Sequence, residues 1–174
     1  PVLFMASTGN KKITTATTGT VINKGACVVI IRTTWNATLL DELEKGCRKV
    51  LKKNGVGNIQ TITVPGAVEI PFAIKRYWEA FKYRDNKPAA FIALGCIIKG
   101  DTPHFDFVAK IVTDGVLQLN LTLPVPTIFG VLTVLTELQA KERLGGKHGH
   151  KGEEAAYTAL SMINLVKSFH TRAS

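Results

Sequence analysis

The sequence lacks any apolar run that approaches the roughly 20 residues needed to cross a bilayer. Residues 1–12 begin with only a short apolar stretch and hold no signal-peptide core. We therefore expect a protein with no membrane partner and no secretion signal, located in the cytoplasm.

Cysteine is scarce, and the three that occur are an odd number. Cys27, Cys47 and Cys96 lie in apolar surroundings and lack the spacing of metal ligands. Such cysteines are typical of small buried side chains in a reducing compartment. We expect neither disulfides nor a metal site.

The usual nucleotide fingerprints are also missing. The chain contains neither a Gly-x-x-x-x-Gly-Lys-[Ser/Thr] loop nor a Gly-x-Gly-x-x-Gly after a strand, so we expect no cofactor. The formal net charge of +9 raises the question of an anionic partner. However, the basic residues are scattered and are not interleaved with aromatic residues as on a base-stacking platform. A nucleic-acid partner is therefore a minor hypothesis.

What the sequence does contain is a regular alternation of strand and helix patterns. Apolar, β-branched runs predict strands at residues 26–33, 59–64, 89–98 and 125–134. Helical spacing of apolar residues predicts helices at 36–54, after the Pro65–Gly66 turn to about 81, and at 105–121, 136–143 and 153–169. Repeated βα units predict an α/β fold in which helices cover both faces of a four-stranded parallel sheet, in three layers. We expect one domain over residues 1–174, with residues 1–24 forming an arm or an extra edge strand.

The most informative stretch is residues 95–106, Gly-Cys-Ile-Ile-Lys-Gly-Asp-Thr-Pro-His-Phe-Asp. It joins the third strand to a helix that Thr102 can cap, with Pro103 at the first helical position. Free N–H groups and the helix dipole favour an anion such as phosphate there, and His104 can move protons near neutral pH. The alternative is a capped helix whose histidine is an ordinary surface residue.

Two other strand-to-helix loops meet at the same edge of such a sheet. One interpretation is that Trp35 offers a flat surface for a planar ring, with Asn36 beside it as a hydrogen-bond donor and acceptor. The other is that Trp35 packs on a helix and Asn36 only caps one. For Glu69, one interpretation is that its carboxylate accepts hydrogen bonds from a polyol or a uracil-like ring. The other is that the carboxylate only interacts favourably with the dipole at the start of a helix. Each residue alone leaves both interpretations open.

Five segments together resemble the lumazine synthase family, and they cover the chain from about residue 20 to 169. In order, they are Trp35–Asn36, VPGAVEIP (64–71), LGCIIKGDTPHFDFV (94–108), PTIFGVLT (126–133) and ERLGGKHGHKGEEAA (142–156). The resemblance implies a flavodoxin-like fold and a transferase of riboflavin biosynthesis. This enzyme condenses 5-amino-6-(D-ribitylamino)uracil with 3,4-dihydroxy-2-butanone 4-phosphate to 6,7-dimethyl-8-ribityllumazine, releasing phosphate and water.

For the aminouracil, the resemblance implies that Trp35 stacks on the pyrimidine ring. Asn36, Ala67 and Glu69 would hold the ribityl chain. Val68 stands where many relatives have an aromatic residue, so the side of the binding pocket next to residues 66 and 67 would be less bulky. Ile97 and Ile98 would line the ring site with backbone contacts, and Gly66 and Lys99 are the other expected substrate-binding residues.

For the phosphate, the resemblance implies the backbone amides of Asp101 and Thr102 together with Arg143, and His104 would transfer protons. The Asp101 carboxylate would repel the phosphate unless it points away. Phe129, Arg143 and Lys151 would come from a neighbouring subunit. Taken alone, Phe129 is more typical of a core residue, and Arg143 and Lys151 are more typical of solvated surface charges.

The family assembles as pentamers, and many members build a shell of 60 subunits. The link at residues 145–150 resembles the short form of shell-forming members, and riboflavin synthase is a candidate partner. The alternative function is a non-catalytic shell, or a protein of the same fold that binds flavin or lumazine.

Overall fold

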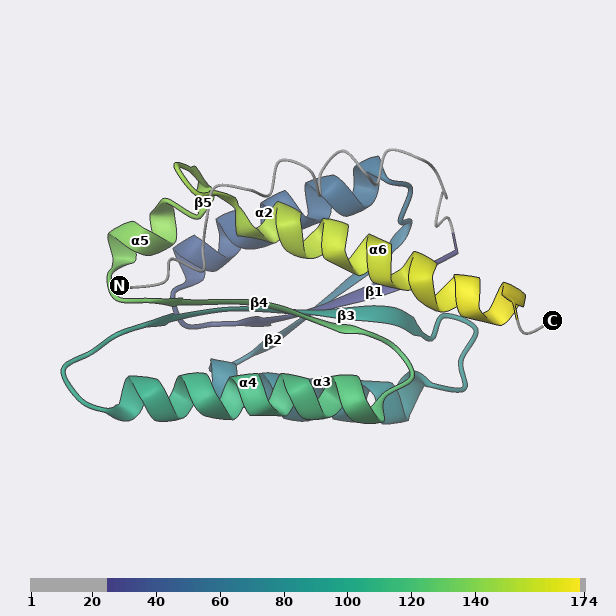
Figure 1. Cartoon of the computed structure of the whole chain (residues 1–174), viewed down its shortest axis with the longest axis horizontal. Helices are drawn as coiled ribbons and strands as arrows, with labels where there is room; N and C mark the ends of the chain where they lie inside the picture. The colour runs from purple at the N-terminus through teal and green to yellow at the C-terminus, as the bar shows by residue number, and fades with distance from the viewer. Residues whose placement is uncertain (1–24, 173–174) are drawn as a thin grey trace.

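Four parallel strands form the central sheet of the computed structural model, which describes residues 25–172 (Figure 1). They are β1 (Cys27–Thr33), β2 (Asn58–Val64), β3 (Pro88–Ile98) and β4 (Thr127–Val134), in the order β2-β1-β3-β4. β1 and β3 therefore occupy the middle of the sheet. This is the flavodoxin-like order of a doubly wound sheet, which confirms the predicted fold class.

Helices cover both faces of the sheet (Figure 1). On one face lie α2 (Ala37–Lys53), α5 (Glu137–Lys141) and α6 (Lys151–Arg172). The short 3-10 turn η2 (Ala67–Glu69), α3 (Ile70–Phe81) and α4 (His104–Thr122) lie on the other. The predicted three layers are therefore present.

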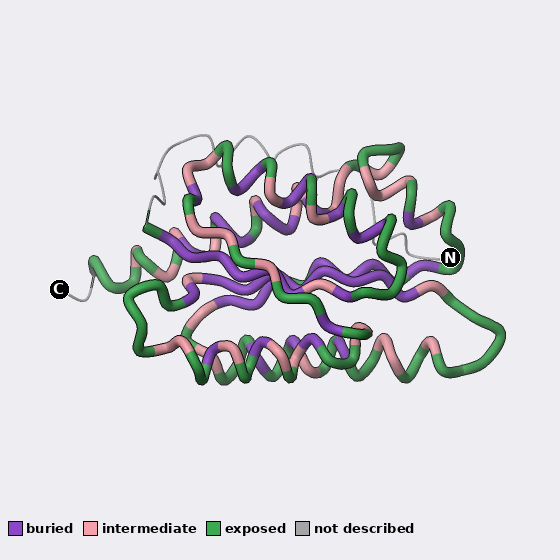
Figure 2. The backbone as a smooth tube through the Cα atoms, turned by 180° about the vertical axis from the view of Figure 1, so that it is seen from behind, coloured by how far each residue is buried: buried purple, intermediate pink, exposed green. Residues whose placement is uncertain are grey.

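The alternation of side chains along β1 divides the core into two clusters. Val28 and Ile30 belong to the cluster under α2 and α6, whereas Val29 and Ile31 belong to the cluster over α3 and α4. All four side chains are fully buried, and the central strands are coloured mostly as buried in Figure 2. A run that is apolar at every position is what a strand covered on both faces requires.

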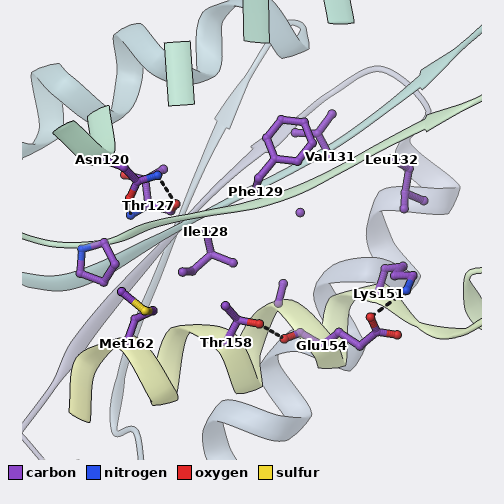
Figure 3. A pocket seen from close by; sticks show the side chains of 13 residues that line it. Asn120, Thr127, Ile128, Phe129, Val131, Leu132, Lys151, Glu154, Thr158 and Met162 are labelled. Atoms are coloured by element: carbon purple, nitrogen blue, oxygen red, sulfur yellow. Dashed lines mark hydrogen bonds and ion pairs between the residues drawn. The ribbon is translucent and has the colours of Figure 1, made fainter. Parts of the chain in front are cut away.

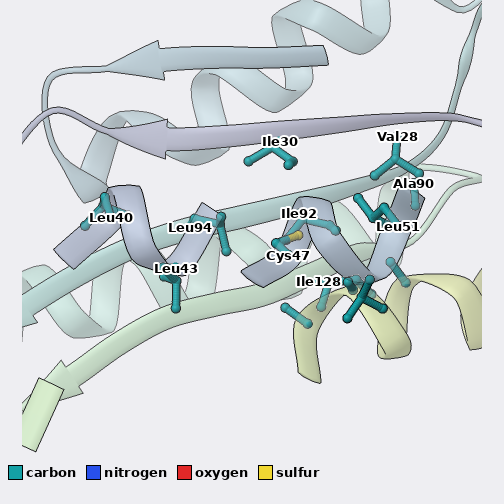
Figure 4. Packing of buried hydrophobic residues seen from close by; sticks show 14 of the residues in the cluster. Val28, Ile30, Leu40, Leu43, Cys47, Leu51, Ala90, Ile92, Leu94 and Ile128 are labelled. Atoms are coloured by element: carbon teal, nitrogen blue, oxygen red, sulfur yellow. The ribbon is translucent and has the colours of Figure 1, made fainter. Parts of the chain in front are cut away.

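The first cluster shows why residues 37–53 form a helix. Leu40, Leu43, Cys47 and Leu51 recur at helical spacing and pack onto the sheet (Figure 4). Each fully buried leucine contributes about 1.5–3 kcal/mol relative to an exposed one. The amphipathic pattern, rather than a side-chain cap, therefore stabilises α2, because no side chain caps its amino end.

Three details differ from the sequence predictions. α4 begins at His104, Pro103 occupies the cap position, and no side chain caps the helix, so the predicted Thr102 cap is wrong. Residues 144–150 form a two-stranded hairpin, β5 (Leu144–Gly146) and β6 (Gly149–His150). α6 begins at Lys151 rather than at 153. The predicted arm or edge strand in residues 1–24 lies outside the described residues.

No helix between residues 25 and 172 is long and apolar enough to cross a membrane. Within the same range, no three His, Cys, Asp or Glu side chains are grouped to hold a metal ion. Cys27, Cys47 and Cys96 are free thiols and all three are buried.

Candidate active site

Three of the loops predicted to form a site meet at the carboxyl edge of the sheet. The backbone N–H of Thr34 donates to Val64 O at 2.8 Å, which joins the loops after β1 and β2. The side-chain amide of Asn36 donates to Cys96 O at 3.0 Å, which joins the loop after β1 to β3. These bonds hold the first three loops at fixed positions relative to one another.

The structure contradicts the alternative in which Trp35 packs on a helix that Asn36 caps. The Trp35 side chain is 74% exposed, so it does not pack on a helix of this chain. Asn36 has a left-handed backbone (φ 60°), which asparagine tolerates better than most residues. Its side chain makes no cap to α2 and reaches β3 instead. The exposed indole face is thus held at the sheet edge, free to stack on a planar group.

The loop after β2 is closed by Glu69. Its Oε2 accepts from the backbone N–H of Gly66 at 2.9 Å, in a capping-box arrangement around η2. Glu69 and Val68 are exposed, while Gly66 and Ala67 are half-buried. The structure therefore gives the carboxylate a local structural role and leaves it at the surface of the same edge.

The loop after β3 presents backbone rather than side chains near the strand end. Ile97 is buried in one core cluster and Ile98 packs against the other, so only their main chain faces the edge. The Lys99 N–H donates to Val134 O at 2.9 Å. Asp101, Thr102 and His104 are exposed at the start of α4, where the dipole of a 19-residue helix favours an anion.

Burial excludes a thiol nucleophile at this edge. Burial, and to a lesser extent the negative charge of Glu137, raise the pKa of Cys96 to about 11. The thiol is therefore protonated near neutral pH, which makes it a poor nucleophile. The His104 side chain, at the start of α4, is exposed at this edge.

Phe129 lies away from this edge in its own chain. Phe129 pairs with Ala93, whereas Thr133 pairs with Ile97 at the carboxyl edge. Four residues of strand separate Phe129 from that edge by about 13 Å. The Phe129 side chain is 41% exposed, so it is not a core residue of this chain. We therefore describe the predicted residues in two groups, and place Lys151, which shares a pocket with Phe129, and Arg143, which is bonded to Lys151, beside Phe129.

We call the first group the edge group: Trp35, Asn36, Gly66, Ala67, Val68, Glu69, Ile97, Ile98, Lys99, Asp101, Thr102 and His104. The second is the β4–α6 group: Phe129, Arg143 and Lys151. In the second group, the Lys151 N–H donates to Arg143 O at 2.9 Å, and Phe129 and Lys151 line one pocket of about 430 Å³ (Figure 3).

That pocket contains residues that the sequence reasoning missed. The ammonium of Lys151 pairs with Glu154 Oε2 at 2.7 Å (Figure 3). Glu154, Thr158 and Met162 line the pocket at steps of four residues along α6. The helical spacing of Lys151 and Glu154 is the signal that could have revealed the pair. Arg143 is held separately, by donation from Nη1 to Gln139 O at 2.8 Å.

The sequence profile described as 6,7-dimethyl-8-ribityllumazine synthase matches residues 25–167. The chain belongs to the lumazine synthase family. A 6,7-dimethyl-8-ribityllumazine synthase of Porphyromonas gingivalis is 47% identical over 135 residues, which are 76% of this chain and 81% of the relative. That of Bacteroides fragilis is 45% identical over 143 residues, covering 81% of this chain and 96% of the relative.

A third lumazine synthase, from Xanthomonas campestris pv. campestris, is 43% identical over 141 residues, covering 80% of this chain and 88% of its own length. The match to the lumazine synthase profile includes both groups of predicted residues, from Trp35 to Lys151. Membership of the family therefore rests on nearly the whole described chain rather than on one motif.

Proposed function

We propose that this chain is a lumazine synthase that condenses 5-amino-6-(D-ribitylamino)uracil with 3,4-dihydroxy-2-butanone 4-phosphate, releasing phosphate and water. The observation that carries the proposal is the convergence of Trp35, Glu69 and His104 at one sheet edge in a member of this family. The site uses neither a metal nor a cofactor, and the chain acts as one domain. The buried free thiols support a reducing, cytoplasmic location.

The aminouracil binds against the loops after β1 and β2 in this proposal. The exposed indole of Trp35 stacks on the pyrimidine, as a flat aromatic surface does with a planar ring. Asn36, Ala67 and Glu69 contact the ribityl chain, and the backbone at Ile97 and Ile98 lines the ring. Because Val68 is smaller than an aromatic residue, the ring has more room on that side.

The butanone phosphate binds at the start of α4. The backbone amides of Asp101 and Thr102 and the positive end of the helix dipole attract the phosphate, and Arg143 of a neighbouring copy completes the site. The proposal requires the Asp101 side chain, which is exposed, to point away from the phosphate. His104 moves the protons as the aryl amine attacks the ketone, phosphate leaves and the ring closes with loss of water.

Two copies of the chain are needed to complete the site. The separation of about 13 Å along β4 keeps Phe129 away from its own edge group. In this proposal, the β4–α6 group of a neighbouring copy supplies Phe129 together with Arg143 and Lys151. Exposed apolar side chains on α4, which a single chain leaves uncovered, support a ring of five copies; they are Phe107, Ile111, Leu117 and Leu121.

The decisive experiment mixes the purified protein with both substrates and follows the absorbance of the lumazine product. We expect acceleration over the spontaneous reaction, and a protein with no acceleration would contradict the proposal. Light scattering measures the assembly, for which we expect a pentamer or a 60-subunit shell. Full activity in a monomer would contradict the shared site.

A further inference from the structure

The imidazole of His150 packs directly on the backbone of α2. A Cβ built on Gly46 would overlap Cε1 of His150 and lie 2.6 Å from its Nδ1. The ring therefore occupies the space that any side chain at position 46 would need. Because the contact is with backbone, the ring has little room to shift toward α2.

A second glycine fixes the same junction from the other side. A Cβ built on Gly152 would overlap Leu43 O and lie 3.2 Å from Cε1 of His150. The first turn of α6 thus lies so close to the backbone of α2 that no side chain fits at position 152. His150 lies between the two glycines, at the point where α2 and α6 meet.

His150 also caps α6. Its Nδ1 accepts a hydrogen bond from the Glu153 N–H, with a long donor–acceptor distance of 3.4 Å. The bond joins a residue to the N–H three positions later, as at a helix N-cap, where one donor would otherwise have no helical partner. The imidazole therefore fixes both the start of α6 and its contact with α2.

The hairpin that ends at His150 connects the two cations of the β4–α6 group. Leu144, next to Arg143, pairs with His150, next to Lys151. The Lys151 N–H donates to Arg143 O at 2.9 Å. Gly145 and Gly149 have positive φ, which glycine adopts without the steric cost that a side chain would add. Any movement of His150 would change the positions of Arg143 and Lys151 together.

We propose that His150 is a positioning residue: its imidazole, packed on Gly46 and capping α6, holds Arg143 and Lys151 where the phosphorylated substrate binds. This rests on the proposed lumazine synthase activity. His150 touches no substrate itself and acts through the hairpin. The effect of His150 is confined to binding of the phosphorylated substrate, because Trp35 and Glu69, which bind the aminouracil in the proposed function, are on other loops.

The test compares variants at positions 46 and 150 in the full chain. For His150→Ala we expect the KM for butanone phosphate to rise about tenfold, because loss of the cap and of the packed ring displaces the hairpin. The KM for the aminouracil should change by less than about twofold, since the edge group is untouched. His150→Asn keeps an oxygen acceptor for the Glu153 N–H and should recover part of the loss.

Gly46→Ala tests the packing without changing the hairpin sequence. Alanine favours a helix over glycine, so a simple helix effect would stabilise the protein. We expect instead that the new methyl group displaces the imidazole and raises the KM for butanone phosphate. In the double variant with His150→Ala the overlap is gone, so its KM should be no worse than that of His150→Ala alone.

Hydrogen exchange of the Lys151 amide provides a measurement that needs no activity. We expect faster exchange in His150→Ala and in Gly46→Ala than in the parent protein. Unchanged KM values in a soluble, folded His150→Ala protein would overturn the proposal, and so would equal rises for both substrates. If the parent protein lacks activity, the proposed function fails. Separately, an unchanged exchange rate of the Lys151 amide in Gly46→Ala would refute the proposal that the contact between His150 and Gly46 positions the hairpin.

Discussion

Glu44 offers a sharp test of how this fold depends on charge. Its carboxylate lies on α2, and its side chain is only 12% exposed. It accepts hydrogen bonds from Arg32 at 2.9 Å, from Arg48 at 2.6 Å and from the Thr61 hydroxyl at 2.7 Å. One carboxylate thereby joins β1, α2 and the edge strand β2. Glu44→Gln keeps the size of the side chain and removes the charge.

The cost follows from those three bonds. A hydrogen bond to a charged group contributes about 1.5–3 kcal/mol, and removing one partner of a fully buried pair costs about 3–5 kcal/mol. Arg48 is about a third exposed, which lowers the cost, and the amide oxygen of glutamine still accepts a bond. We therefore expect a loss of about 2 kcal/mol in the free energy of unfolding. For a chain of this size, that lowers Tm by about 6 °C.

The pH dependence of the difference has a defined sign. Burial alone would raise the pKa of Glu44, but the bonds from Arg48, Thr61 and Arg32 outweigh it and lower the pKa below its ordinary value of 4.5. The stabilisation is therefore complete above pH 4.5 and is lost as the pH falls through the lower pKa of the folded state. The difference in the free energy of unfolding between the parent protein and Glu44→Gln should become smaller in that acidic range.

The assay is thermal and urea unfolding at one protein concentration, since assembly shifts apparent stability. Glu42→Gln is the matched control, because Glu42 is on the same helix and pairs with Lys45 at an exposed site. We expect it to change stability by less than about 0.5 kcal/mol. Equal losses of unfolding free energy in Glu44→Gln and Glu42→Gln would refute the reasoning. A difference between the parent protein and Glu44→Gln that is as large in acid as at neutral pH would also refute it.

Three further predictions concern the proposed site. His104→Ala should lower turnover about a hundredfold, the lower range for general acid–base catalysis; full turnover from pH 6 to 8 would assign proton transfer elsewhere. Arg143→Ala should raise the KM for butanone phosphate about tenfold and leave the aminouracil KM nearly unchanged, since only the phosphate is paired with the guanidinium; equal losses for both substrates would argue against this role. Asn36→Gly should weaken aminouracil binding through loss of the amide bond to Cys96 O, and Asn36→Ala should in addition lose about 1 kcal/mol of stability, because alanine resists a φ of 60°. Indistinguishable unfolding curves for the two variants would contradict that backbone argument.

The sequence predicted the layers and most element boundaries well because the relevant signals are local and strong. β1 and β3 are apolar at nearly every position, and α2 repeats its apolar residues at helical spacing. Three strand-to-helix loops could be assigned to one edge because parallel strands end on the same side. The family membership and fold class are confirmed, and the roles of the site residues stay predictions.

Other features depend on contacts that no local pattern encodes. The β5–β6 hairpin is too short to show a strand alternation, and its geometry depends on the positive φ of Gly145 and Gly149. The bond from Asn36 to Cys96 O joins residues far apart in sequence, so cap chemistry alone suggested the wrong partner. Thr102 matched the pattern of a helix cap, but the helix begins with Pro103 in that position.

The division of the site into an edge group and a β4–α6 group has a genetic consequence. In the proposed ring, each chain contributes its edge group to one site and its β4–α6 group to the next. A chain damaged in His104 and a chain damaged in Arg143 would each be inactive alone, yet a mixed ring would contain some sites with both residues intact. Two recessive alleles of this one gene would therefore complement each other. A chain damaged at both positions would instead disable two sites in every ring that it enters, and would act as a dominant inhibitor.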